Sequence, residues 1–163
     1  MTTMLKGGLV FGSIAGSALV CLAQITKPAA SDNEHRWSQD TFRIIHRVSD
    51  LPPAVKKQFP APDMQRDFRM ADPGKPYQAT CIVTKPRLPS RRLIFAGLSK
   101  DHCFVHYERG GRGYSRSLVV FRLSNNEARF IGGSNVRRPS PDLQALLASV
   151  QATDLENKQT YSW

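Results

Sequence analysis

The feature that most constrains the fold is a series of four apolar segments of strand length in the C-terminal half, each joined to the next by a short polar turn. The segments span residues 92–98, 103–108, 114–123 and 127–132. The last turn is Asn125-Asn126, a pair that accepts the positive φ angles of a two-residue hairpin loop. Strands connected this closely pair as antiparallel neighbours. The sequence therefore predicts a four-stranded antiparallel β-meander.

Further elements are predicted on the N-terminal side of this meander. Residues 41–48 suit a fifth strand, with Arg43 and Arg47 facing water. Residues 52–59 suit a short helix, because proline is tolerated in a first helical turn. Residues 63–90 are rich in proline and hold one strand-like stretch, 79–84, and a turn at 72–74.

A C-terminal helix is predicted to begin at Ser140. We expect Ser140 to cap it, Pro141 to take its first position and Asp142 to face the positive end of its dipole. Its apolar residues form one stripe: Leu143, Leu146, Leu147 and Val150. A lone helix must bury such a stripe, and the meander offers a face for it. The predicted fold class is α+β, an antiparallel β-meander of four to five strands packed against a C-terminal α-helix, plus one short N-terminal helix.

The first 23 residues have the pattern of a secretory signal peptide. Lys6 precedes an uncharged run, residues 7–22, and Cys21 and Ala23 supply the small residues that a signal peptidase recognises. An uncleaved anchor is the main competing interpretation, although a spanning helix needs about 20 apolar residues. Lipid attachment at Cys21 and a buried core helix would also account for the uncharged run. We therefore expect an extracytoplasmic protein, either periplasmic or secreted.

The chain has the size of one domain. Its 163 residues divide into a signal peptide (1–23), a polar tether (24–35), a single α+β domain (36–151) and a polar C-terminal tail (152–163). Its formal net charge is +10, which favours attraction to anionic partners. Cleavage of the leader would leave Cys81 and Cys103, and an even pair in an oxidising compartment predicts a disulfide. Two buried free thiols are the alternative.

Two histidines and a glutamate lie on the second strand of the predicted meander. His102 and His106 are four residues apart, about 13 Å along a strand, which is too far to share one metal ion. We interpret both as facing solvent. Glu108 shares a strand face with His106, and we expect it to pair with Arg116 on the next strand. A His106/Glu108 acid–base pair in a cleft is the catalytic alternative.

No motif in the sequence fixes a reaction, since neither a G-x-S-x-G elbow nor an H-E-x-x-H helix occurs. We predict an exported, non-catalytic module that binds a ligand or a protein through a sheet face lined by His106, Glu108, Arg116 and Arg122. Two competing hypotheses are a small extracytoplasmic hydrolase that uses His106 and Glu108, and an electrostatic binder of anionic surfaces. We expect no cofactor and no metal. The expected partner is a protein or an anionic ligand, with nucleic acid disfavoured by export and membrane contact limited to the periphery or to an uncleaved leader.

Overall fold

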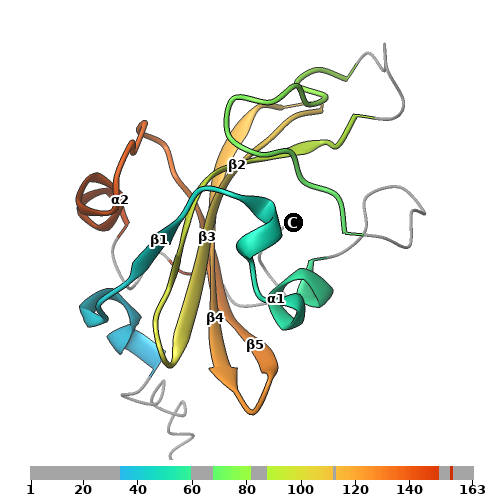
Figure 1. The fold of residues 1–163 in the computed structure, drawn as a ribbon. Helices are drawn as coiled ribbons and strands as arrows, with labels where there is room; N and C mark the ends of the chain where they lie inside the picture. The colour runs from blue at the N-terminus through green and yellow to red at the C-terminus, as the bar shows by residue number, and fades with distance from the viewer. Residues whose placement is uncertain (1–33, 60–67, 82–87, 112, 151–154, 156–163) are drawn as a thin grey trace, which may run out of the picture.

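The centre of the fold is a five-stranded antiparallel sheet whose strands are neighbours in chain order (Figure 1). The structure, a computed structural model, describes residues 34–59, 68–81, 88–111, 113–150 and 155. The strands are β1 (Arg43–Ile45), β2 (Arg91–Leu98), β3 (His102–Arg109), β4 (Ser115–Ser124) and β5 (Glu127–Asn135). The predicted meander is therefore confirmed, and residues 41–48 contribute the fifth strand.

The β4–β5 hairpin turns through the predicted asparagine pair. Asn125 has a φ of 48° and Asn126 a φ of 63°, and Ser124 lies opposite Glu127. Two positive φ angles in a two-residue loop give a turn whose twist matches that of the flanking strands. The predicted turn at Asp72-Pro73-Gly74 is also present, with Gly74 at a φ of 73°.

Strand β1 is shorter than the predicted 41–48. It pairs with β2 over three residues, and a 3-10 helix, η2 (Val48–Asp50), follows it. The Val48 N–H donates a hydrogen bond of 2.6 Å to a carboxylate oxygen of Asp72. This bond occupies a backbone donor that a longer strand would need for pairing, so the chain leaves the sheet early. Arg43 and Arg47 are both exposed, as predicted.

The N-terminal helices of the described part are short. Residues Glu34–Gln39 form a 3-10 helix, η1, and Pro53–Gln58 form α1, with Pro53 in the first turn as predicted. The predicted strand at 79–84 is reduced to one parallel bridge between Thr80 and Gly111 within the described residues. Residues 82–84 of that prediction lie outside the described residues.

Helix α2 (Leu143–Ser149) begins later than predicted. Its N-cap is Asp142, whose side chain accepts a hydrogen bond from the Ala145 N–H at 2.8 Å. Ser140 is buried instead, and its hydroxyl lies 3.2 Å from that of Ser149. The assignment of Ser140 as the cap was wrong because an aspartate closer to the apolar stripe satisfies the same free N–H groups.

Two apolar clusters form the core, and each contains residues from one side of the sheet. The first contains Val55 of α1, with Ile45, Val105, Tyr107 and Phe121 among its strand residues. The second contains Leu146 of α2, with Trp37, Phe95, Phe104 and Val120. Figure 1 shows α1 and α2 on opposite sides of the sheet. In the middle of the sheet, therefore, side chains on both faces are buried.

The second cluster contains a close contact between neighbouring strands. Gly97 on β2 pairs with Phe104 on β3, and a Cβ at position 97 would lie 2.1 Å from Cε1 of the Phe104 ring. Phe104 also packs edge-on against Phe42, with ring centroids 4.9 Å apart. Because Gly97 has no side chain, the Phe104 ring fits beside it. From this position the ring packs against Phe42, in the segment before β1. None of the described helices is long and apolar enough to cross a membrane.

Candidate functional site

The four residues predicted to line one sheet face do not form one continuous surface. Glu108 and Arg116 face each other on β3 and β4. Arg122 lies six residues further along β4, about 20 Å from Arg116, and faces His102. His106 lies between these two ends and is completely buried. The structure therefore divides the predicted surface into two ends separated by core.

His106 is part of the aromatic core. Its ring packs edge-on against Phe95 at 5.4 Å, and its Nδ1 lies 3.1 Å from the Ser117 carbonyl oxygen. Its Nε2 is buried without a partner, and burial lowers the pKa of the ring. His102 is only 5% exposed. The prediction that both histidines face solvent was wrong, because period-two alternation separates the two faces of a strand but does not show that both are covered.

Glu108 is held by several donors at once. Arg92 on β2 forms an ion pair with its Oε2, through Nε at 2.9 Å, and the Tyr114 hydroxyl donates to Oε1 at 2.7 Å. Burial alone would raise the pKa of Glu108, but the hydrogen bonds from Tyr114 and Arg92 outweigh it and lower the pKa. The carboxylate is thus ionised, and each of its two oxygens accepts a hydrogen bond. The expected partner, Arg116, lies opposite Glu108, but the ion pair forms with Arg92.

Arg116 is stacked on an aromatic ring. Its guanidinium carbon lies 5.1 Å from the centroid of Tyr114, whose hydroxyl is bonded to Glu108. Burial and the hydrogen bond to Glu108 raise the pKa of Tyr114 to about 12, so its proton stays in place at physiological pH. The two side chains border a pocket of about 240 Å³, whose lining is Tyr114, Ser115, Arg116, Asn135, Val136 and Arg137. Of the residues that the structure describes, this lining contains two arginines and no acidic residue.

Arg122 borders a second pocket at the opposite end of the β4–β5 hairpin. The pocket has a volume of about 400 Å³ and is lined by Gln58, Arg122, Ser124, Glu127, Ala128, Arg129 and Phe130. Arg129 lies directly opposite Arg122 in the β4–β5 register. Like charges in this position repel each other, and Glu127 supplies an acidic group to the same pocket.

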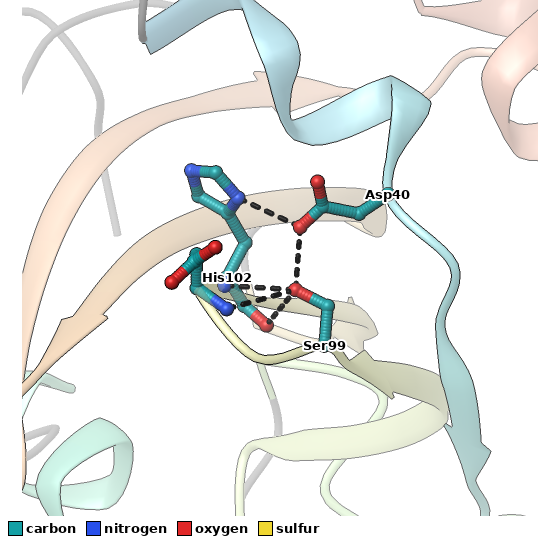
Figure 2. Close-up of polar contacts among 4 residues, drawn as sticks. Asp40, Ser99 and His102 are labelled. Atoms are coloured by element: carbon teal, nitrogen blue, oxygen red, sulfur yellow. Dashed lines mark hydrogen bonds and ion pairs between the residues drawn. The ribbon is translucent and has the colours of Figure 1, made fainter.

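A network of Asp40, Ser99 and His102 was not predicted from the sequence (Figure 2). One carboxylate oxygen of Asp40 lies 2.8 Å from His102 Nδ1 and accepts a hydrogen bond of 2.5 Å from the Ser99 hydroxyl. Ser99 also accepts from the backbone N–H groups of Asp101 and His102, at the turn between β2 and β3. The network therefore fastens the chain before β1 to that turn.

The same three residue types occur in nucleophilic hydrolases, but their geometry differs here. A Ser-His-Asp triad requires the serine hydroxyl to contact the histidine nitrogen that points away from the aspartate. In this protein Ser99 bonds to Asp40, and His102 Nε2 is buried with no hydrogen-bond partner in the part of the chain that the structure describes. Hydrogen bonds from Ser99 and His102 outweigh the effect of burial and lower the pKa of Asp40. The arrangement holds two segments together and does not activate a nucleophile.

The two cysteines predicted to form a disulfide are free thiols in this structure. Cys81 is exposed, whereas Cys103 is buried near the start of β3. Thr80, the neighbour of Cys81, forms its bridge with Gly111, beyond the other end of β3. Eight residues of extended chain separate Cys103 from Gly111, about 26 Å, whereas a disulfide needs Cα atoms within about 7 Å. The two cysteines are therefore not joined in this structure, and the Cys81–Cys103 bridge stays a prediction.

Comparisons with known proteins do not identify a family for this chain. No family model matches it, and neither a curated protein nor a solved structure is similar to it. Among the described residues, no group of three or more potential metal ligands lies together. A function must therefore be inferred from the geometry of the chain itself.

Proposed function

We propose that this protein is an exported, non-catalytic binding module that holds an anionic group in the pocket between Arg116 and Arg137. The observation that carries the proposal is the lining of that pocket, which among the described residues contains two arginines and no carboxylate. A guanidinium group offers a planar set of donors that matches a carboxylate, sulfate or phosphate group. The net charge of +10 favours approach of such a ligand from solution.

The surroundings of Arg116 support its role as a ligand contact. Glu108, the acid opposite it, is already bonded to Arg92 and Tyr114. Stacking on Tyr114 occupies one face of the guanidinium and leaves the N–H groups at its edge able to meet a ligand. Arg137 is exposed at the same pocket. Arg116 is therefore held by Tyr114 before binding, which lowers the entropy cost of capture at this residue.

The burial of His106 favours binding over the hydrolase hypothesis. A general base must come within hydrogen-bond distance of its substrate, and His106 has no exposed surface. Glu108, its proposed partner, is ionised and bonded on both oxygens, so it has no proton to donate. Neither residue is placed to act on a molecule in solvent.

Export and the covering of the sheet by α2 are further parts of the proposal. The proposed signal peptide and residues 24–33 of the proposed tether lie outside the described residues, and so does almost all of the proposed tail. For α2, the complete burial of Leu146 and its place in the cluster around Phe104 support a helix that covers this face. Intact mass of the protein recovered from its native compartment tests export. A chain that begins at Gln24 is expected, and a full-length chain in a cytoplasmic fraction would contradict it.

The anion site is tested by comparing two double variants that remove the same charge. Arg116→Ala with Arg137→Ala removes the pocket arginines, whereas Arg43→Ala with Arg47→Ala removes exposed arginines elsewhere. Binding to immobilised heparin, a sulfated polysaccharide, is measured at physiological salt, with circular dichroism to verify folding. Each pocket arginine is expected to contribute about tenfold to affinity. An equal loss in both double variants would show non-specific charge attraction and would refute the site.

A further inference from the structure

Five of the fifteen arginines of this protein lie on the β4–β5 hairpin and the segment that follows it. Between residues 113 and 138 the acidic residue is Glu127, and the basic residues are all arginines: Arg116, Arg122, Arg129, Arg137 and Arg138. The absence of lysine from this stretch favours planar, bidentate recognition of anionic groups over simple charge attraction. The positive charge of this stretch is therefore carried by guanidinium groups.

These arginines are grouped at two pockets that lie at opposite ends of β5. Residues 135–137 line the Arg116 pocket, and residues 127–130 line the Arg122 pocket. Arg116 and Arg122 are six residues apart on β4, which corresponds to about 20 Å. The Debye length at physiological salt is about 8 Å, so the two pockets act as separate sites. A ligand that uses both must therefore be long and carry several anionic groups.

The end of the hairpin near Arg122 brings two arginines together in one pocket, which Glu127 also lines. Arg122 lies between His102 on β3 and Arg129 on β5 in the cross-strand register. Arg129 has a further contact of its own, so we place the ligand contact on Arg122. Among the described residues His102 Nε2, in the neighbouring register position, has no hydrogen-bond partner, whereas its Nδ1 lies 2.8 Å from an oxygen of Asp40. An anionic group of a ligand would meet Arg122 in this pocket.

We infer that the ligand is an extended acidic polysaccharide that follows β5 and places anionic groups in both pockets. This inference rests on the proposed function, because the Arg116 pocket is one of its two contacts. Tyr114, beside that pocket, is 49% exposed and offers part of its ring to a sugar. Binding at two linked sites multiplies the affinity of each, often by about 10² or more.

The described surface fits other polyanions less well. Proteins that bind single-stranded nucleic acid stack successive bases on several aromatic rings, but Tyr114 is the one aromatic residue among the large exposed apolar side chains of the described residues. The other such side chain is Ile44, on β1 at the opposite edge of the sheet. Apart from Tyr114, the described residues therefore offer an anionic bilayer no large exposed apolar side chain beside these arginines. An export compartment also favours polysaccharide over nucleic acid.

The test compares heparin fragments of two lengths by isothermal titration calorimetry. A dodecasaccharide can reach both pockets, whereas a disaccharide can occupy only one. We expect the dodecasaccharide to bind the unmodified protein at least about 100-fold more tightly than the disaccharide. Arg122→Ala should weaken dodecasaccharide binding by at least about tenfold. The disaccharide should still bind at the Arg116 pocket. Arg122→Lys, which keeps the charge and the side-chain stem, should give an intermediate loss and guards against a folding defect.

The outcomes separate this inference from the proposed function. If both fragments bind with similar affinity, or if Arg122→Ala has no effect while Arg116→Ala weakens binding, the two-pocket inference is overturned and the Arg116 site stands. If Arg116→Ala has no effect on either fragment, the proposed function itself fails. A single-stranded oligonucleotide or phosphatidylserine vesicles that bind more tightly than the dodecasaccharide, through the same arginines, would overturn the assignment to polysaccharide.

Discussion

Gly97→Ala tests the contact that holds the second apolar cluster together. The added methyl group would lie 2.1, 2.6 and 2.9 Å from three carbon atoms of the Phe104 ring, whereas carbon atoms in contact are normally about 3.5–4.0 Å apart. The ring must therefore move by more than about 1 Å. Trp37, Phe42 and Phe95 surround it, and Phe104 itself has no exposed surface.

The expected cost is the difference between two opposing effects. Overpacking of a filled core costs about 1–3 kcal/mol. Replacing glycine by alanine restricts the unfolded chain and returns about 0.4–1 kcal/mol. We expect Gly97→Ala to lower the free energy of unfolding by about 1–2 kcal/mol, as measured by urea titration followed by circular dichroism. Gly113→Ala is the matched control, because a Cβ at Gly113 would meet no atom within 4 Å.

A double-mutant cycle identifies Phe104 as the cause. In the Phe104→Leu background the smaller side chain leaves room for the methyl group, so Gly97→Ala should cost less than it does beside phenylalanine. If Gly97→Ala is as stable as Gly113→Ala, or if its cost is the same in both backgrounds, the ring does not lie over Gly97. The described packing of this face would then be incorrect.

Two further predictions concern the second cluster and its buried histidine. Leu146→Ala should lower the free energy of unfolding by about 2–5 kcal/mol if α2 covers the sheet, whereas exposed Gln144→Ala should change it by less than about 0.5 kcal/mol; equal effects in urea titrations would place the helix elsewhere. Burial lowers the pKa of His106 in the folded state, so the unfolded chain binds the proton first, and stability should fall as the pH drops below about 6.5. His106→Leu should reduce this pH dependence in urea titrations between pH 5 and 8, whereas exposed His46→Leu should retain it; an unchanged slope in the first variant would contradict a buried, neutral His106.

The strand order of this protein follows from local sequence, which is why it could be predicted. Each pair of neighbours from β2 to β5 is joined by a short connection, and the turn at Asn125-Asn126 determines its own hairpin. The end of β1 could not be predicted in this way. It depends on the hydrogen bond from Val48 to Asp72, and the two residues are separated by 24 positions.

The candidate site was predicted only in part, because burial depends on what covers each face. Alternation placed Glu108 opposite Arg116 correctly, but it could not show that the cluster around Phe104 buries His106. The contact between Asp40 and His102 spans 62 residues and has no sequence signal of its own. Similarly, the sequence could not show that Arg116 and Arg122 border pockets, so their spacing alone did not predict two separate sites.

The network of Asp40, Ser99 and His102 also has a consequence for the order of folding. The hairpins from β2 to β5 close short loops, whereas the contact between Ser99 and Asp40 closes a loop of 59 residues. Closing a longer loop costs more chain entropy, so local hairpins form before distant contacts. We therefore expect the segment around Trp37 and Asp40 to dock last on a sheet that is already formed. By the same reasoning it is the first part to detach, and its amides should exchange with solvent sooner than those of β3 and β4.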